Sequence, residues 1–329
     1  MLRVALAGAG MVSLHHLRAW AVTSNATVVA IADPDGMRAR ARAAEFGIAQ
    51  SFGSTEEMLD ALRPDALDVA AGHAAHRQLC LAAAERGIAV LCQKPLGPTL
   101  AAALSIVDAV GSRTRLMVHE NWRFRPWYRQ AAAWIGEGAI GAPRRLTLSA
   151  RSSGFLLRDG RQAALERQPM LAHIPRLMIG EVLVHHLDVA CCLVGALHVT
   201  GASIERRIAG IPGETAARIR LEGQGVHAVV EGDMADPDAA APVTDSMHLE
   251  GTDGAITLDG CRLSLAGRRA QQLDFDLDAG YQGSYDAAIA HFAGALLGQQ
   301  PFATPPDVHV RILALAEDAY RHASATGRT

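Results

Sequence analysis

Lysine is almost absent from this sequence. Lys94 is the only lysine among 31 basic residues, and the other 30 are arginines. Arginine can replace lysine on most solvated surfaces, but not where a side chain must exchange a proton or act as a compact ammonium donor. Lys94 is therefore either a chance remainder of compositional drift or a functional group. The residues around it indicate which of the two applies.

Charge of either sign is also scarce. Charged residues make up 20% of the chain, a little below the usual fraction, and the formal net charge is -3. The cluster Arg38, Arg40 and Arg42 has the spacing of a solvated helix face rather than of a basic stripe, so we expect no nucleic-acid partner. No run of about 18 apolar residues is free of charge, so we also expect no membrane span.

The cysteines are few and lack a recognisable spacing. There are five of them, an odd number, with no Cys-x-x-Cys pair, which indicates neither a zinc site nor a disulfide framework. Met1–Ala9 is apolar but runs into a glycine turn without the length or cleavage site of a signal peptide. We therefore expect a cytoplasmic protein in a reducing compartment. A length of 329 residues suggests about two domains.

A strand, a glycine turn and a helix start open the chain. Arg3–Ala7 is a short apolar strand, the turn Gly8–Ser13 reads GAGMVS, and a helix is predicted over Leu14–Val22. In dinucleotide-binding proteins the glycines of such a turn let the pyrophosphate approach backbone N–H groups at the positive end of the helix. Ser13 replaces the third glycine of the usual pattern. We expect the cofactor to contact Gly8, Gly10, Met11 and Val12.

The second strand, Ala26–Ala32, ends at Asp33, 25 residues after Gly8. A carboxylate at this position accepts hydrogen bonds from the ribose hydroxyls of NAD and repels the additional phosphate of NADP. The following Pro34-Asp35 supplies no basic residue to bind that phosphate. The pattern therefore predicts NAD as the cofactor. Asp33 could also be the N-cap of the next helix, and that role would be compatible with binding the ribose.

Lys94 follows a buried strand, Gly87–Cys92, and precedes Pro95, which lacks an N–H group and ends the strand. Ligands of open parallel sheets bind beyond the carboxyl ends of the strands. We therefore expect Lys94 at the same edge as the glycine turn. The loop Gly72–His76, after the strand Ala66–Ala71, belongs to this edge as well. Further cofactor contacts are expected from Gly72, His76, Gln93 and Lys94.

From Asn121 the regular exchange of strands and helices gives way to segments in which apolar and polar residues alternate. We predict a Rossmann domain in residues 1–120 and a substrate and oligomerisation domain in residues 121–329. The alternating segments predict a mainly antiparallel, open-faced sheet with helices on one side, in a protein of the α/β class. Exposed sheets of this type usually pair, so we expect a homodimer or homotetramer. The segments are Arg144–Ser152, Val199–Ile208, Ala217–Leu221, Val226–Met234 and Ser246–Leu258.

Three polar residues share one face of a predicted apolar helix. Glu181, His185 and Asp188 are spaced i, i+4 and i+7. Burying such groups without partners is costly, and a histidine beside a carboxylate can act as a general base. The alternatives are a core histidine with a structural hydrogen bond and a metal site that includes His186. Adjacent histidines on a helix point about 100° apart, so we predict no metal.

Together these motifs resemble the Gfo/Idh/MocA oxidoreductases over essentially the whole chain. They are the GAGMVS turn, His16, Asp33, CQKP, NWRF and the Glu-x3-His-x2-Asp helix, in the family's order. The resemblance implies an NAD(P)-binding Rossmann domain with an open-faced sheet domain, acting mostly on sugars and cyclitols. It matches Lys94 to the lysine of a catalytic Glu-Lys-Pro motif. It also matches Glu181 and His185 to an Asp-x-Gly-x-His helix, and Asp188 to a later acid.

The sequence departs from the family pattern at four places. Gln93 stands in place of glutamate, Glu181 in place of aspartate, and Leu183 in place of glycine; Ala71-Gly72-His73 occupies the position of a common Thr-Pro-Pro. Gln93 can still bind ribose or amide groups, whereas the longer Glu181 leaves open which substrate hydroxyl it reaches. Within the family, CQKPL, HENWRFRP, Arg151–Gly154 and EVLVHHLD are most similar to the branch that oxidises the branched pentose D-apiose with NAD to the lactone or acid.

These matches give an expected mechanism. His185 would take the proton of the anomeric hydroxyl as the hydride leaves for NAD, and Lys94 would donate to the developing oxyanion. Glu181 would pair with Lys94 or orient the sugar. Arg123 and Arg151 could instead form ion pairs across the domain interface. The residues expected to contact the substrate are Asn121, Arg123, Arg151 and Tyr281, with His186 and Asp188 as weaker candidates.

Two other functions fit an NAD-binding chain of this kind. The first is a non-catalytic NAD-binding sensor or repressor subunit. Retention of Lys94, His185 and a nearby acid argues against it, because a sensor could lose all three without penalty. The second is a redox-neutral enzyme that uses tightly bound NAD for a transient oxidation. Net accumulation of NADH with a sugar would indicate a dehydrogenase rather than either alternative.

Overall fold

The computed structural model describes residues 1–325, and the chain divides into two compact units. The Rossmann unit comprises Met1–Phe124 and Tyr281–Arg311. The sheet unit comprises Arg125–Gly280 and the C-terminal segment from Ile312.

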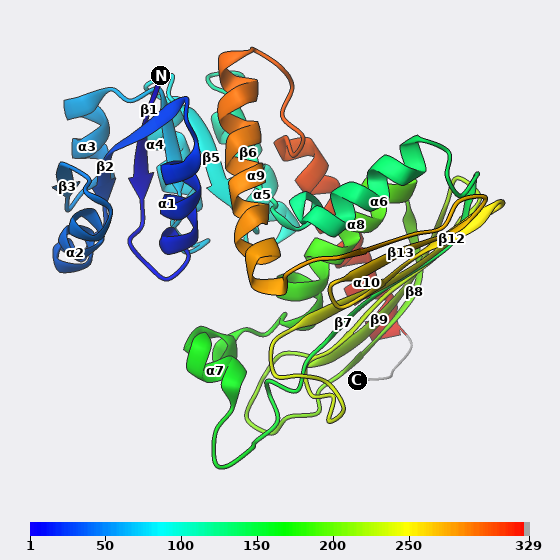
Figure 1. The fold of residues 1–329 in the computed structure, drawn as a ribbon. Coiled ribbons are helices and arrows are strands. Elements are labelled where there is room, and N and C mark those ends of the chain that lie inside the picture. The colour runs from blue at the N-terminus through cyan, green and yellow to red at the C-terminus, as the bar shows by residue number, and fades with distance from the viewer. Residues whose placement is uncertain (326–329) are drawn as a thin grey trace. The chain divides into compact units, whose positions relative to one another are not determined.

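Six parallel strands form the sheet of the Rossmann unit, in the order β3-β2-β1-β4-β5-β6 (Figure 1). Every residue of β4, β5 and β6 is buried, as expected for apolar strands of a parallel sheet that is covered on both faces. The strands are β1 Leu2–Ala7, β2 Ala26–Ala32, β3 Gln50–Phe52, β4 Ala66–Val69, β5 Ala89–Gln93 and β6 Leu116–His119. The helices between them are α1 Ser13–Val22, α2 Gly36–Phe46, α3 Thr55–Leu62, α4 His76–Ala84 and α5 Leu100–Val110.

Most of the helix α9, Leu277–Leu297, belongs to the Rossmann unit, although the residue pattern predicts a single division at 120/121. The side chains of Tyr285 and Ile289 join the core cluster that contains Trp20. In the same cluster Phe292 stacks on Phe302, with 5.2 Å between the ring centroids. Dividing the chain once would separate α9 from this core. The two units therefore interleave along the sequence.

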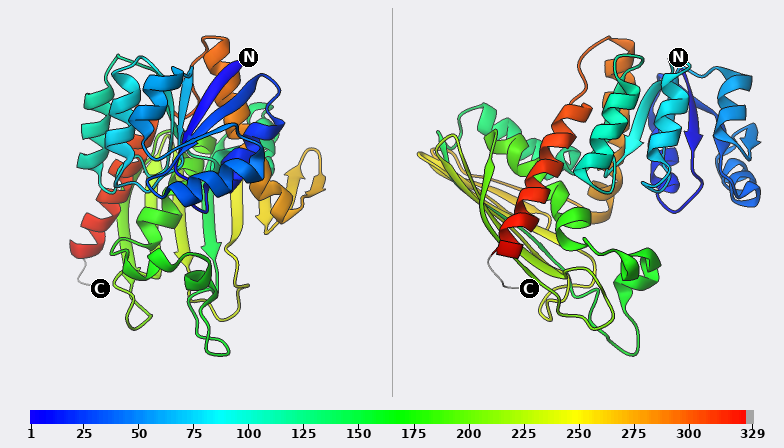
Figure 2. Two further views of the ribbon diagram at one scale, coloured as in Figure 1. Left: turned by 90° about the vertical axis from the view of Figure 1, so that its left-hand side faces the viewer. Right: turned by 180° about the vertical axis from the view of Figure 1, so that it is seen from behind.

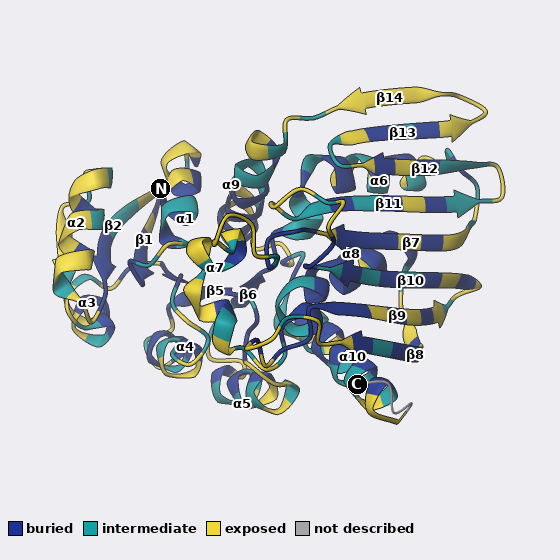
Figure 3. Cartoon of the chain, turned by 90° about the horizontal axis from the view of Figure 1, so that it is seen from below, coloured by how far each residue is buried: buried dark blue, intermediate teal, exposed yellow. Residues whose placement is uncertain are grey.

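The sheet unit contains an eight-stranded sheet in the order β14-β13-β12-β11-β7-β10-β9-β8 (Figure 3). Neighbouring strands are antiparallel except β7 and β10, which run parallel. The predicted α/β class and the mainly antiparallel second sheet are thus confirmed. The strands are β7 Pro143–Arg151, β8 His198–Glu205, β9 Ala216–Gly223, β10 Val226–Asp233, β11 Thr244–Gly251, β12 Gly254–Asp259, β13 Arg262–Gly267 and β14 Gln271–Asp274.

One face of this sheet packs on helices and the other is exposed. The helix α8, Val184–Val194, contacts β7, β10 and the helix α6, Pro126–Gly136; both helices lie on the same side of the sheet (Figure 2). Leu146 and Leu148 are buried on that side, whereas Arg145 and Thr147 of the same strand are exposed. The alternation in the sequence therefore distinguishes the two faces. The remaining helices are α7 Ala163–Arg167 and α10 Pro306–Ala325.

Candidate functional site

The glycine turn after β1 lies against the end of β4. Gly8 has a φ of +105°, and a Cβ atom at this position would lie 2.6 Å from the carbonyl oxygen of Ala70. Only glycine tolerates both the backbone conformation and the close approach. The turn is thereby held at the carboxyl edge of the sheet, where dinucleotides bind in this fold.

The turn presents a row of backbone donors. The N–H groups of Gly10, Met11 and Val12 donate no hydrogen bond to any part of the chain from residue 1 to 325. The first helix begins at Ser13, whose hydroxyl donates to the carbonyl oxygen of Gly10 at 2.6 Å, and Val12 supplies no side-chain cap. Donors at the positive end of a helix form an anion site. This arrangement fits the pyrophosphate of NAD.

Asp33 ties the second strand to the glycine turn. Its Oδ2 accepts a hydrogen bond from Ala9 N at 2.8 Å, and its Oδ1 accepts one from Asp35 N at 2.8 Å. An ionised carboxylate has about four acceptor positions, so Asp33 can also accept from ribose hydroxyls. The N-cap of α2 is Asp35, not Asp33. The guanidinium of Arg38 lies 3.7 Å from Asp33, a basic neighbour that the residues directly after Asp33 do not reveal.

His76, expected to contact the cofactor, is a buried structural residue. Its Nε2 lies 3.0 Å from the carbonyl oxygen of Ala71 and its Nδ1 lies 3.2 Å from that of Leu96. Burial lowers the pKa of the imidazole. The ring thus joins two loops at the carboxyl edge, and this geometry does not favour a cofactor contact. A Cβ atom at Gly72 would meet nothing within 4 Å, so no close approach requires that glycine.

A buried chain of hydrogen bonds runs from Asp68 to the backbone of Lys94. Asp68 Oδ2 accepts from Trp20 Nε1 at 2.7 Å and from His16 Nδ1 at 2.8 Å. His16 Nε2 therefore has no proton in the neutral ring and accepts from Gln93 Nε2 at 2.8 Å. Gln93 Oε1 in turn accepts from Lys94 N at 2.9 Å. In the sequence His16 is recognisable only as part of the family pattern, and no motif assigns a role to Asp68.

Lys94 directly follows β5 and is half-buried. The Lys94–Pro95 peptide bond is cis. Because β1, β2 and β5 are parallel strands of one sheet, their carboxyl ends bring the glycine turn, Asp33 and Lys94 to the same edge.

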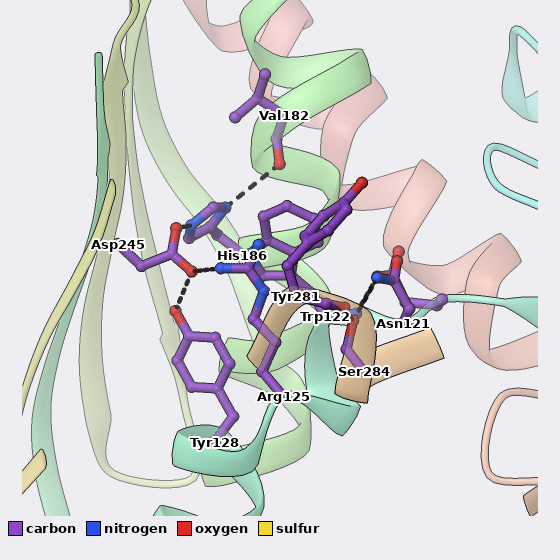
Figure 4. Close-up of polar contacts among 10 residues, drawn as sticks. Asn121, Trp122, Arg125, Tyr128, Val182, His186, Asp245, Tyr281 and Ser284 are labelled. Atoms are coloured by element: carbon purple, nitrogen blue, oxygen red, sulfur yellow. Dashed lines mark hydrogen bonds and ion pairs between the residues drawn. The ribbon is translucent and has the colours of Figure 1, made fainter. Parts of the chain in front are cut away.

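Three predicted substrate contacts take part in bonds within the Rossmann unit. Asn121 Nδ2 donates to Ser284 Oγ at 2.8 Å (Figure 4). Arg123 Nη1 donates to the carbonyl oxygen of Ala303 at 3.0 Å. The hydroxyl of Tyr281 lies 3.2 Å from that of Tyr285. These bonds fix the side chains, and their contact with a substrate stays a prediction.

The helix around Glu181 is not a regular α-helix, contrary to the prediction. A π-helical turn spans Met178–Leu183, with Val184 N bonded to Ile179 O, and α8 begins at Val184. Because α-helical spacing does not apply across a π-turn, the shared face of Glu181 and His185 stays a prediction. His185 and Asp188 lie within α8 and share a face. Both are buried, at 5% and 1% exposure, whereas Glu181 is half-buried.

The start of the π-turn is anchored by a buried glutamate. Glu214 Oε1 accepts hydrogen bonds from Ile179 N at 3.0 Å and from the hydroxyl of Tyr320 at 2.5 Å. Burial, reinforced by the charge of Glu214, raises the pKa of Tyr320 far above its usual range, so the phenol remains a donor. A carboxylate from one loop and a phenol from the C-terminal helix thus fix the segment that carries Glu181.

His186, a weaker substrate candidate, belongs to a buried polar network (Figure 4). Its Nε2 lies 3.0 Å from Asp245 Oδ1, and its Nδ1 lies 3.3 Å from Val182 O. Asp245 Oδ2 also accepts from Arg125 Nη1 at 2.8 Å and from Tyr128 Oη at 3.0 Å. Burial alone would raise the pKa of Asp245, but Arg125 and His186 outweigh it and hold that pKa well below its usual range. This bonding fixes the ring of His186, and its contact with a substrate stays a prediction.

Arg151, another predicted substrate contact, forms an ion pair inside the sheet unit. Its Nε lies 2.5 Å from Asp236 Oδ2, and the Asp236 side chain is almost fully buried while that of Arg151 is 59% exposed. The suggested pairing with residues of the other domain is therefore not needed to hold this side chain.

Residues 1–325 contain neither a cluster suited to a metal ion nor a helix suited to crossing a membrane. No group of three or more His, Cys, Asp or Glu side chains has an arrangement that could hold a metal ion. None of the described helices combines the length and the apolar character that crossing a membrane requires.

Comparison with known proteins gives matches along the whole chain. The model of the oxidoreductase family with an NAD-binding Rossmann fold matches residues 2–120. A D-apiose dehydrogenase of Rhizobium rhizogenes is 30% identical over 345 aligned positions, which cover 100% of this chain and 96% of that protein. A D-apiose dehydrogenase of Paraburkholderia graminis is 35% identical, with 77% of this chain and 66% of that protein covered.

A solved structure agrees with these matches. An oxidoreductase from Agrobacterium radiobacter, crystallised with NAD+, L-tartaric acid and magnesium, superposes with a TM-score of 0.91 at 28% identity and covers 99% of this chain and 97% of its own. Fold, cofactor turn and sequence identity converge. The chain belongs to the Gfo/Idh/MocA family of NAD-binding oxidoreductases.

Proposed function

We propose that this NAD-dependent dehydrogenase oxidises an aldose, D-apiose, at its anomeric carbon to the lactone, which then hydrolyses to the acid. The observation that carries the proposal is the 30% identity over the full chain with a D-apiose dehydrogenase, of which 96% is covered. Lys94 at the carboxyl end of β5 and the buried His185 supply the side-chain chemistry that an alcohol oxidation needs.

The proposed mechanism assigns one role to each of these side chains. NAD, when bound, supplies the acceptor for the hydride of the anomeric C–H bond. His185 takes the proton of the anomeric hydroxyl, and the Lys94 ammonium donates a hydrogen bond to the same oxygen as negative charge develops on it. Glu181 orients the sugar. The N–H groups of Gly10, Met11 and Val12 and the carboxylate of Asp33 hold the cofactor.

A substrate panel tests the proposed reaction. Purified protein is incubated with D-apiose, D-xylose, D-glucose or myo-inositol and with NAD or NADP, and NADH or NADPH is followed by its absorbance. The lactone is trapped with hydroxylamine as a hydroxamate, which a ketone formed at a ring hydroxyl would not give. We expect NADH and hydroxamate with D-apiose. NADH with another sugar would overturn the substrate, and no NADH with any would favour the sensor or the redox-neutral enzyme.

Two variants test the catalytic roles. Lys94→Ala and His185→Ala should lower kcat by about a hundredfold or more while NAD binding, measured by calorimetry, persists, because both act in the chemical step. Arg40→Ala, on the solvated face of α2, is the matched control and should retain wild-type kcat. Full turnover in either catalytic variant would contradict the assignment.

A further inference from the structure

Glu120 is a buried acid that the proposed mechanism does not use. It directly follows β6, its side chain is 1% exposed, and its Oε1 accepts a hydrogen bond from Trp122 N at 3.1 Å. Burying a carboxylate is costly unless positive charge or donors surround it. The surroundings of Glu120 therefore indicate what the acid does.

The strand register places Glu120 beside Lys94. Strands β5 and β6 are parallel neighbours, and Gln93 is paired with His119. Each strand ends at that pair. Lys94 and Glu120 are therefore the first residues after two neighbouring strands, at the carboxyl edge of the sheet. Neighbouring strands lie about 4.8 Å apart, a separation that a lysine and a glutamate side chain easily span.

The charges around Glu120 come from three elements. Burial raises the pKa of its carboxyl group, and His309 in its protonated form, Lys94 and Arg123 act in the opposite direction. His309 on α10 accepts a hydrogen bond from Leu96 N through Nε2 at 3.2 Å, which requires that nitrogen to carry no proton and favours a neutral ring. Lys94 and Arg123 are therefore the cations that compensate Glu120.

Gln93, the residue before Lys94, cannot supply the opposite charge. Its amide is neutral, and its Nε2 and Oε1 are bonded to His16 and to the backbone N–H group of Lys94. Arg123 acts on Glu120 as well, but its Nη1 also donates to the carbonyl oxygen of Ala303. Among the acids near the end of β5, Glu120 on the adjacent strand is the one whose position suits the ammonium group.

We propose that Glu120 is the buried counter-ion of Lys94, which holds the ammonium group in place and keeps it protonated near neutral pH. Glu120 is thus a positioning residue that acts through Lys94. Its catalytic consequence rests on the proposed function, because it matters for turnover only if Lys94 acts on the substrate. The pairing of the two charges does not depend on which sugar is oxidised.

The single lysine makes the proposal directly measurable. Acetic anhydride at trace concentration acylates only the neutral form of an amine, and mass spectrometry of the peptide containing Lys94 reports its rate against the N-terminal α-amine as internal reference. We expect Glu120→Gln to raise the acylation rate of Lys94 about tenfold at neutral pH, because the ammonium form loses its counter-ion. At strongly alkaline pH, where the amine is neutral in both proteins, the two rates should converge.

Two further variants separate charge from packing. Glu120→Asp keeps the charge and should restore most of the protection of Lys94. Glu214→Gln removes a different buried carboxylate, in the sheet unit, and should leave Lys94 labelling unchanged. An unchanged rate in Glu120→Gln, or an equal increase at every pH, would overturn the proposal, because the latter would indicate greater exposure rather than a lost charge.

A second measurement covers the case in which Glu120→Gln does not fold. Lys94→Met removes a positive neighbour and should raise the pKa of Glu120 further. Infrared spectra should then show a protonated carboxyl band that wild type lacks at the same pH; its absence would contradict the proposal. Neither experiment uses substrate, so the counter-ion role can stand if no sugar is oxidised. It can also fall while D-apiose oxidation stands.

Discussion

We propose that Asp33 sets the preference between NAD and NADP. Its carboxylate is oriented by Ala9 N and Asp35 N, and it lies where the ribose of the cofactor binds in this fold. Arg38 lies 3.7 Å away and also pairs with Asp35 at 3.0 Å. The preference for NAD therefore depends on one carboxylate next to an arginine that could bind a phosphate.

Replacing Asp33 should relax this preference. In Asp33→Ser the repulsion of the NADP phosphate is lost and Arg38 becomes available to it, so the ratio of kcat/KM for NADP to that for NAD should rise about tenfold or more, which corresponds to about 1.4 kcal/mol. The double variant Asp33→Ser/Arg38→Ala should lose most of this gain. An unchanged ratio in the single variant would show that other residues set the cofactor preference.

The roles of some single residues could be predicted from the sequence, and those of others could not. The Gly8 turn and Asp33 are local features of a strand end, so pattern and spacing were enough to find them. The ring of His76 bonds Leu96, 20 residues further along the chain, which no local pattern reveals; its contact with the cofactor stays a prediction. Glu120 gave no sequence signal of its own, since its significance comes from the neighbouring strand.

Elements were predictable where the apolar period is clear. The strand Ala26–Ala32 has the predicted bounds. The strand Gln50–Phe52 is short and largely exposed, so it has no apolar signature. The helix α9 contains Gly280, Gly283 and Gly294, which are poor helix formers, and it is stabilised by packing that its sequence does not reveal.

The π-turn shows a further limit of pattern reading. Its residues Met178–Leu183 have the same apolar spacing as an α-helix, and only the bond from Val184 N to Ile179 O distinguishes the two. The anchor that fixes this turn, Glu214, lies 35 residues from Ile179 in the sequence. Because apolar spacing alone does not reveal a π-turn, the local backbone geometry at Glu181 could not be obtained from it.

Asp245 joins three elements, and its loss should destabilise the sheet unit. It is carried by β11 and accepts from Arg125 before α6, from Tyr128 in α6 and from His186 in α8. Asp245→Asn should lower the free energy of unfolding by about 3–5 kcal/mol at neutral pH, because it leaves Arg125 buried without its counter-ion. Asp274→Asn, which breaks an exposed pair with Arg262, should change the free energy of unfolding far less.

The pH dependence of this difference checks its origin. The pKa of Asp245 is lower in the folded protein than in the unfolded chain. Its contribution to stability is therefore present above the unfolded pKa, about 3.9, and is lost as the pH falls through the folded value. Urea unfolding should show a difference in the free energy of unfolding between wild type and Asp245→Asn. This difference should be constant above about pH 5 and should shrink in more acidic solution. A difference that does not change with pH would assign the effect to packing.

At the scale of the whole molecule, the exposed face of the eight-stranded sheet takes no part in the proposed reaction. It carries exposed polar and charged residues on adjacent strands, among them Arg145, Thr147 and His227. We expect this face to pair with a second copy, as the sequence analysis proposed. Light scattering coupled to gel filtration should give a mass of two or four chains. A single chain at micromolar concentration would contradict the expectation.

The central claim is that the hydride comes from the anomeric carbon of D-apiose, and isotope transfer tests it most directly. D-apiose deuterated at C1 is incubated with the protein and NAD, and the reduced cofactor is examined by mass spectrometry and NMR. We expect NADH that carries the deuterium, together with a lactone that has lost it. NADH formed without deuterium, or no NADH at all, would overturn the proposed reaction.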